Sequence, residues 1–307
     1  MWLVFVLYAL FASVFTVSKE CLAFTEPLFF VGSRMATAGG LLLLFQLVRG
    51  RGVRIDRGSL FLVAQLAFVA IYLTNALEVW GLQYLTSFKT CFIYSLSPFL
   101  TALLSYWLLK DRIRGKQWLA LVVGFAGCVP VMLDQTLQEG LAGSLLGFSW
   151  AELAVLGAAI SGVYGWIVLS RLVSQRKLSP LTVNGWAMLI GGGAALLHSA
   201  FVENWNPLPT TRPLAFLWHA GIVLVISNLV AYNLYGYLLR RFSTTLMSFA
   251  GFSTFFFTAL FGWLFLNERV TWPFYLSAAF VFGALTLYHS AEIRQKGWVF
   301  AKRETEY

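Results

Sequence analysis

Charged residues are scarce in this sequence. Asp, Glu, Lys and Arg make up only 11 % of the 307 residues, whereas 59 % are apolar. A soluble protein of this length needs far more polar surface to stay dissolved, so the composition excludes an ordinary soluble domain. Much of the surface must therefore face lipid. The 12 Trp, 12 Tyr and 28 Phe residues suit a helix bundle with aromatic belts at the membrane interfaces.

The residue patterns of enzymes and metal sites are also missing. The three cysteines, Cys21, Cys91 and Cys128, do not have the spacing of metal ligands, and the three histidines are scattered over different apolar runs. The sequence contains no HExxH, Walker A or GxSxG motif. We therefore expect no metal, no cofactor, no direct coupling to ATP and no enzymatic activity.

The net charge of +9 raises the alternative of nucleic-acid binding. The Lys and Arg residues lie in short loops between apolar runs, where such residues orient membrane proteins. The sequence has no soluble domain and no basic amphipathic stretch to hold a nucleic acid. We expect the lipid bilayer to be a partner, and nucleic acid not to be one.

Ten apolar runs are long enough to cross a bilayer, which takes about 20 residues in a helix. The runs are continuous rather than alternating, which favours helices over barrel strands. The first run lacks a basic leader and a cleavage site, so we expect it to be retained as a helix. The sequence thus predicts an all-α polytopic membrane protein with ten transmembrane helices. The predicted spans are 2–18, 28–48, 59–81, 87–109, 116–133, 148–170, 181–202, 214–238, 244–266 and 272–291.

The basic residues are distributed unevenly between the two sides of these spans. With loops assigned alternately, 17 Lys and Arg residues lie on the side of the N-terminus, 3 lie on the other side and 2 lie within spans, which accounts for all 22. The positive-inside rule then places both termini in the cytoplasm.

The two halves of the chain resemble each other. Residues 97–103 match 254–260 at an offset of 157, and residues 27–40 match 180–193 at an offset of 153. The difference between the offsets fits a longer loop after the seventh predicted span. The sequence therefore predicts an internal duplication.

Each predicted repeat, 1–140 and 141–307, contains five helices and the second ends in a short cytoplasmic tail. Because five is an odd number, the second repeat must enter the membrane upside down. Inverted repeats are typical of secondary transporters, which place the substrate between the two related halves.

A set of short stretches, spread over almost the whole chain, carries a family resemblance: Lys19, Pro27, Arg34, 82–87, Pro98, 110–112, 179–180 and 266–269. Together they resemble the EamA-type branch of the drug/metabolite transporter superfamily. The resemblance implies ten helices, a substrate cavity between the halves, and uptake, exchange or export of a metabolite. It also implies a bacterial inner membrane as the location.

Three positions depart from the family pattern. Asp111 stands where Glu is usual, Phe255 occupies the position equivalent to Pro98, and Lys89 stands where small apolar side chains are usual. These departures leave the expected fold intact but weaken any inference of the substrate from the family.

Four ionisable residues within or beside the spans are candidates for function, because such residues face a cavity or a partner. Glu78 and Lys89 are expected at similar depth near the outer surface. They would form either a salt bridge or a gate, or a pair of handles for a zwitterionic substrate. The family position of Arg34 suggests a structural or gating pair. Glu152 begins the sixth span, where the helix dipole stabilises an acidic residue.

Neutral polar and aromatic side chains form stripes at helical spacing on the third and eighth spans, which are equivalent in the two repeats. The two stripes would meet across the pseudo-symmetry axis and line a cavity. The alternative is ordinary hydrogen bonding between helices. The candidate substrate-binding residues are Tyr72, Asn75, Glu78, Lys89, Tyr94, Tyr164, Trp166, Asn228, Tyr232 and Tyr235.

These features favour a secondary transporter that works by alternating access. An acidic group among Tyr and Trp rings favours a cationic ligand through cation–π attraction. Together with a similarity to S-adenosylmethionine carriers of this family, this predicts an amino-acid-derived cation such as S-adenosylmethionine. It would be taken up or exchanged for S-adenosylhomocysteine. Proton coupling would need an internal carboxylate, for which Glu78 is the candidate.

Two alternatives stay open at this point. The same fold serves amino-acid or multidrug efflux, which the direction of flux would separate from uptake. A membrane scaffold that transports nothing would show no saturable ligand binding. The sequence predicts a small-molecule substrate as partner, together with a proton or a counter-substrate. It does not determine the oligomeric state.

Overall fold

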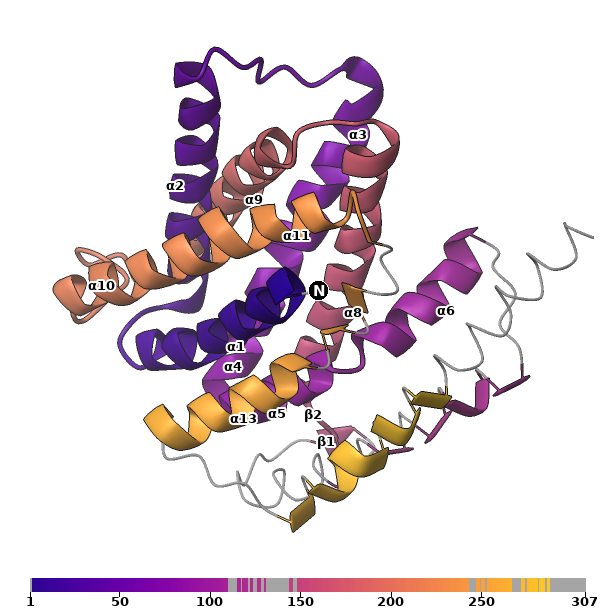
Figure 1. The fold of residues 1–307 in the computed structure, drawn as a ribbon. Helices are drawn as coiled ribbons and strands as arrows, with labels where there is room; N and C mark the ends of the chain where they lie inside the picture. Colours follow the sequence, from indigo (N-terminus) through magenta and orange to yellow (C-terminus); the bar gives the residue numbers. More distant parts are fainter. Residues whose placement is uncertain are drawn as a thin grey trace, which may run out of the picture.

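The computed structural model describes residues 2–109, 148–242 and 253–266, with parts of 115–130, 144–145, 247–251 and 272–287. In this part of the chain nearly all residues are helical (Figure 1). Apart from the connecting loops, the described residues include one antiparallel pair of two-residue strands, β1 (Ser144–Leu145) and β2 (Phe148–Ser149). The expected helical fold is thus confirmed.

The first half starts with α1 (Trp2–Leu22) and α2 (Pro27–Val48). The third predicted span is one long rod made of α3 (Arg57–Gln65), a π-helical segment η1 (Leu66–Leu73) and α4 (Thr74–Tyr84).

The fourth predicted span, 87–109, is not one continuous helix. It is divided into α5 (Ser87–Tyr94) and α6 (Ser97–Leu109) by a turn at Ser95 and Leu96. The break lies just before Pro98, which has no N–H to donate to the carbonyl of Tyr94 and whose ring would clash with it.

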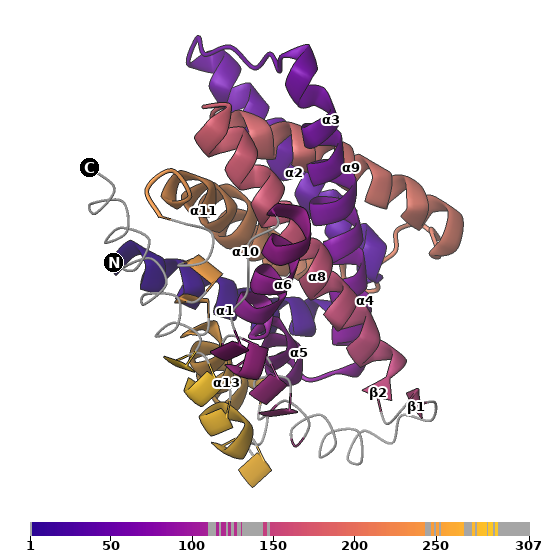
Figure 2. The ribbon, with the colours of Figure 1, turned by 90° about the vertical axis from the view of Figure 1, so that its right-hand side faces the viewer.

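The described part of the second half also contains long helices and a rod with a π-helical segment. It contains α8 (Trp150–Ser170), which continues as the π-helical η2 (Arg171–Gln175), and then α9 (Pro180–Val202). A second long rod follows, made of α10 (Pro213–Val223), η3 (Leu224–Ala231, again π-helical) and α11 (Tyr232–Leu238). The last described long helix is α13 (Ser253–Leu266). Figure 2 shows α8 beside α4, against which it packs.

Six helical rods among the described residues are long and apolar enough to cross a membrane. They coincide with the first, second, third, sixth, seventh and eighth predicted spans. The fifth, ninth and tenth predicted spans are described only in part, and the predicted repeat boundary at 140/141 lies outside the described residues. The same holds for Asp111, Cys128 and the motif at 267–269.

Helices α2 and α9 make the most extensive helix contact among the described elements, and their backbones approach closely. A Cβ atom added at Gly39 would lie 2.4 Å from the backbone nitrogen of Leu189, and one added at Gly192 would lie 2.4 Å from that of Ala36. Glycine is therefore needed on both helices, as is common where membrane helices approach closely. Gly39 and Gly192 are the pair that the predicted internal repeat relates at an offset of 153.

The two long rods share a second feature, a π-helical segment followed by an asparagine. The amide of Asn75 donates to the carbonyl of Ile71 at 2.8 Å, and the amide of Asn233 donates to the carbonyl of Leu229 at 3.0 Å. A π segment shifts the backbone hydrogen bonds and frees carbonyls, which must find another donor inside a bilayer. Asn233 and Leu229 each follow their counterparts Asn75 and Ile71 by 158 residues. The two rods therefore satisfy a freed carbonyl with an asparagine at the same relative position.

The loops gather in two groups at opposite ends of α2. At the end of α2 that leads to the basic loops, Arg176 lies 3.9 Å from Asp56, and the indole of Trp186 donates to the carbonyl of Val53 at 2.7 Å. At the other end, Glu26 N donates to the carbonyl of Pro209 at 3.0 Å, and the Glu203 carboxylate accepts from the first amides of α2. Two of the loops predicted for the basic side, at 49–56 and 176–179, thus lie at the same end of α2.

Replacement of Asn233 by Ala is expected to lower the free energy of unfolding by about 1–3 kcal/mol, because buried carbonyls freed by η3 lose their donor. Thermal unfolding in detergent measures this loss. The matched control is Asn204→Ala, at an exposed loop residue, which should leave the unfolding temperature unchanged. Equal unfolding temperatures for the two variants would contradict the assigned role of Asn233.

Candidate functional site

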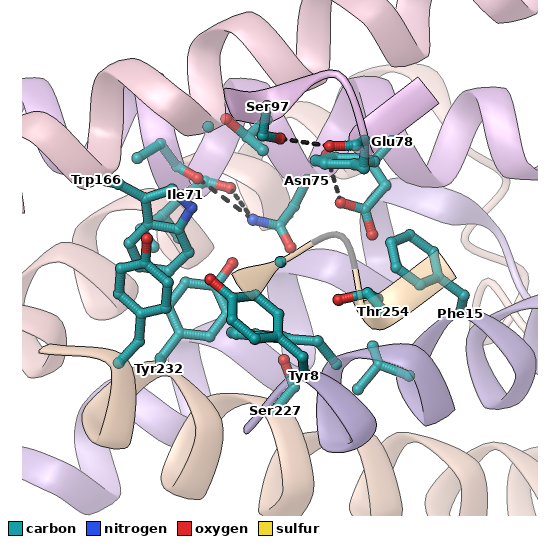
Figure 3. A pocket seen from close by; sticks show the side chains of 18 of the residues that line it. Tyr8, Phe15, Ile71, Asn75, Glu78, Ser97, Trp166, Ser227, Tyr232 and Thr254 are labelled. Atoms are coloured by element: carbon teal, nitrogen blue, oxygen red, sulfur yellow. Dashed lines mark hydrogen bonds between the residues drawn. The ribbon is translucent and has the colours of Figure 1, made fainter. Parts of the chain in front are cut away.

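A cavity lies in the interior of the bundle, between α1, α2, the two long rods, α5 and α8 (Figure 3). The space between the lining atoms is about 1120 Å³, part of it open to the outside. The charged lining residues are Arg34 and Glu78, and the aromatic lining residues are Tyr8, Phe11, Phe15, Tyr94, Trp166, Tyr232 and Tyr235.

Glu78 lies on α4 and is the only acidic residue among the described lining residues. Its Oε2 accepts a hydrogen bond from the hydroxyl of Tyr94 at 2.6 Å, and the Tyr94 ring lies 5.7 Å from the ring of Phe15. α5 and α1 thus hold the carboxylate in place at the cavity surface. In Figure 3, Glu78 lies beside Phe15 and Thr254.

Arg34 lies on α2 and is only 3 % exposed. Its Nη2 donates to Asn75 Oδ1 at 2.9 Å and its Nη1 donates to Asn228 Oδ1 at 3.3 Å. The guanidinium also lies 5.0 Å from the centroid of the Phe30 ring. Asn75 and Asn228 belong to the two equivalent rods, so Arg34 joins both halves while it faces the cavity. The sequence predicted a structural or gating role for Arg34, but it did not predict that Arg34 lines the cavity.

Four aromatic rings form a cluster at another part of the cavity. The rings of Trp166 and Tyr235 are stacked with centroids 4.0 Å apart, and the Tyr232 ring lies 5.4 Å from Trp166. Phe11 on α1 lies 6.0 Å from Tyr232 and 6.4 Å from both Trp166 and Tyr235. Such a group of ring faces can hold an aromatic base or a cation.

The contribution of α1 was missing from the candidates. Tyr8, Phe11 and Phe15 all line the cavity. Their spacing of three and four residues places them on one face of the helix. That spacing is the signal that could have identified them, although a lipid-facing stripe has the same pattern.

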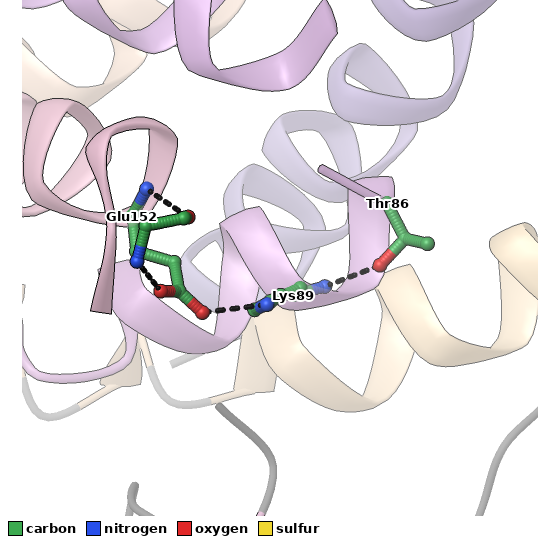
Figure 4. A network of polar contacts seen from close by, with 4 residues as sticks. Thr86, Lys89 and Glu152 are labelled. Carbon is green, nitrogen blue, oxygen red and sulfur yellow. Dashed lines mark hydrogen bonds and ion pairs between the residues drawn. The ribbon is translucent and has the colours of Figure 1, made fainter. Parts of the chain in front are cut away.

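The expected pair of Glu78 and Lys89 does not exist, and this prediction was wrong. Lys89 Nζ instead lies 2.5 Å from Glu152 Oε1, with both side chains fully buried (Figure 4). Lys89 is not among the described residues that line the cavity, so its role as a substrate-binding residue stays a prediction without support from this geometry. Lys89 lies in the first turn of α5, which the Thr86 side chain caps, and the packing of α5 on α8 turns its side chain towards Glu152.

Glu152 has the position that the helix-dipole interpretation predicts. It lies in the first turn of α8, and its Oε2 accepts from the Ser149 backbone amide at 2.6 Å. The Ser149 hydroxyl accepts from the Glu152 amide in return, which completes a capping box. Glu152 therefore both caps α8 and neutralises Lys89.

Tyr72 and Tyr164 are also absent from the described cavity lining. The Tyr72 hydroxyl contacts His198 Nδ1 at 2.7 Å. Tyr72 belongs to η1, whose wider turns rotate it away from the face of Asn75. Tyr164 precedes Trp166 by two residues, which is about 200° around a helix, so the two side chains point to different faces.

The remaining candidates are brought together. Asn75, Glu78, Tyr94, Trp166, Tyr232 and Tyr235 line the cavity. Asn228 lies behind them, fully buried, where it binds Arg34 and lies 3.0 Å from the sulfur of Met35. Asn228 therefore follows the alternative interpretation of the polar stripes, in which a polar side chain forms hydrogen bonds between helices.

Comparison with known proteins decides the family. The model of the EamA-like transporter family matches residues 1–133 and 149–289. The chain belongs to this family. The EamA resemblance of the sequence is thus confirmed, and the protein is a multi-pass membrane transporter and not an enzyme.

Several relatives of this EamA protein have informative names. It is 37 % identical over 305 residues to a protein of Chlamydia muridarum named S-adenosylmethionine/S-adenosylhomocysteine transporter, covering 98 % of this chain and 94 % of the relative. The namesake in Chlamydia trachomatis serovar L2 is 36 % identical, covering 96 % and 90 %. A solved crystal structure that is 14 % identical shares the fold, with a TM-score of 0.68 and 96 % of each chain covered.

Removal of the Lys89 charge in Lys89→Met is expected to destabilise the protein by about 3–5 kcal/mol, because the Glu152 carboxylate stays buried without its cation. The double variant Lys89→Met/Glu152→Gln should recover much of this loss, since Gln keeps the cap. Thermal unfolding in detergent compares the variants.

The matched control is Arg176→Met, which removes the exposed partner of Asp56; these side chains are 50 % and 53 % exposed. It should cost less than about 1 kcal/mol. If Lys89→Met/Glu152→Gln were as unstable as Lys89→Met, the ion pair with Glu152 would not be the reason why Lys89 stabilises the protein.

Proposed function

We propose that this EamA transporter exchanges S-adenosylmethionine for S-adenosylhomocysteine across a bacterial inner membrane. The observation that carries the proposal is the cavity, which offers one carboxylate and a cluster of four aromatic rings. The substrate has matching parts, since it combines a sulfonium cation with an aromatic base and an amino-acid end. The names of the Chlamydia relatives support the same substrate.

The proposed mechanism is alternating access by two inverted five-helix repeats, approximately 1–140 and 141–307. Two related features support it: the glycine contact between α2 and α9, and the π segments with Asn75 and Asn233, which recur at nearly the same offset. Two such halves can exchange conformations around a cavity to which both contribute. A gradient of the exchanged substrate supplies the driving force.

Exchange is tested in proteoliposomes loaded with unlabelled S-adenosylhomocysteine. Labelled S-adenosylmethionine should enter faster than it enters empty vesicles. The variant Trp166→Leu should reduce this uptake at least about tenfold, because it removes a ring face of the aromatic cluster. Trp107→Leu, at a residue that is 80 % exposed, is the matched control and should transport normally.

The outcome also separates the alternatives. Uptake that follows an imposed proton gradient, and does not depend on the internal substrate, would replace exchange by proton coupling. Transport of unrelated amino acids or drugs, with no competition by S-adenosylhomocysteine, would contradict the substrate. Absence of any saturable binding would favour a scaffold.

The proposed orientation places both termini and the basic loops in the cytoplasm. Single cysteines at Arg54 and Arg176, introduced after replacement of the native cysteines, should react only from the cytoplasmic side with a membrane-impermeant maleimide. A cysteine at Asn204 should react only from the opposite side. Labelling of Arg54→Cys and Arg176→Cys from different sides would contradict the inverted arrangement.

A further inference from the structure

Two opposite charges line the cavity without neutralising each other. Arg34 and Glu78 are close enough to interact electrostatically, yet no ion pair joins them in the described part of the chain. Charged groups inside a membrane protein are normally paired, because a desolvated single charge is costly. We propose that Arg34 binds the α-carboxylate of the substrate and Glu78 its α-ammonium group. This assignment rests on the proposed function and deepens it.

The guanidinium of Arg34 has N–H donors without an acceptor among the described residues. It donates two hydrogen bonds to the neutral amides of Asn75 and Asn228, and within the described residues its Nε has no acceptor, although it is buried. A guanidinium carries five N–H donors in a planar fork that matches a carboxylate. A substrate carboxylate therefore supplies both the missing negative charge and the missing acceptors.

Glu78 complements Arg34 in charge, and the two residues are near enough to interact electrostatically. In such a molecule the carboxylate and the ammonium group are attached to one carbon atom, so their binding partners must be neighbours that do not bind each other. Asn75 lies one helical turn from Glu78 and accepts a hydrogen bond from Arg34 at 2.9 Å. Both charges are thus anchored to the same stretch of α4.

The position of the aromatic cluster assigns the rest of the substrate. Figure 3 shows Trp166 and Tyr232 on the opposite side of the cavity from Glu78, with Asn75 between them. The sulfonium and the adenine are joined to one ribose and both favour aromatic faces. They belong to the ring cluster, and the amino-acid end belongs to Arg34 and Glu78.

Ligands that lack single groups test the role of Arg34 in detergent-solubilised protein by calorimetric titration. Decarboxylated S-adenosylmethionine has the ammonium and the sulfonium but no carboxylate. In Arg34→Gln, the affinity for S-adenosylmethionine should fall about tenfold to hundredfold, while that for the decarboxylated ligand stays the same. The matched control Arg54→Gln, at an exposed loop residue, should leave both affinities unchanged.

The role of Glu78 is tested with the pair of natural ligands. S-adenosylhomocysteine has the ammonium group but no sulfonium charge. Glu78→Gln should therefore weaken both ligands by a similar factor. A much larger loss for S-adenosylmethionine alone would assign Glu78 to the sulfonium and overturn the proposal.

Two further outcomes keep the test decisive. 5′-Methylthioadenosine, which lacks the whole amino-acid end, should bind Arg34→Gln as it binds the unaltered protein, and this shows that the variant is folded. If Arg34→Gln lost the same affinity for S-adenosylmethionine and for its decarboxylated form, Arg34 would have only a structural role between the two rods. That result would overturn its assignment to the carboxylate. If the unaltered protein does not bind S-adenosylmethionine at all, the proposed function fails first and the inference falls with it.

Discussion

The core of a bilayer offers no water to polar groups, and this constraint accounts for most of the polar contacts in this protein. Where η1 and η3 free backbone carbonyls, Asn75 and Asn233 supply the donors. Where α4 ends, the Lys19 ammonium donates to the carbonyls of Leu82 and Leu85, each at 2.7 Å. Lysine suits this position, because the end of a helix carries a partial negative charge.

The same constraint distinguishes structural charges from functional ones. Lys89 and Glu152 are fully buried and satisfy each other, so they are held as part of the scaffold. Within the described part of the chain, the hydrogen bonds of Arg34 and Glu78 go to neutral side chains, and both residues line the cavity. A buried charge that no ion pair neutralises is the more informative one, because its desolvation is costly.

The close contact between α2 and α9 has a mechanical consequence. At Gly39 and Gly192 the two helices meet backbone against backbone, which leaves no room there for a side chain. The two π segments lie in the long rods, whose turns are wider and less regular than in an α-helix. Asn75 donates to the carbonyl of Ile71 in η1 and also belongs to the hydrogen-bond network of Arg34, so the cavity lining and the geometry of the rod are physically connected.

The sequence by itself determined the membrane-spanning helices that the structure describes, the family and the transporter class. The reason is that hydropathy and motif spacing are properties of each segment, readable along the chain. Tertiary structure decided which charges pair, since Lys89 pairs with Glu152 and not with Glu78. It also decided which rings line the cavity: Phe11 packs in the aromatic cluster, whereas Tyr72 contacts His198. These choices depend on how helices rotate and cross, and that is set by the packing of α5 on α8, by the π segment in the third span and by Pro98, none of which a hydropathy pattern contains.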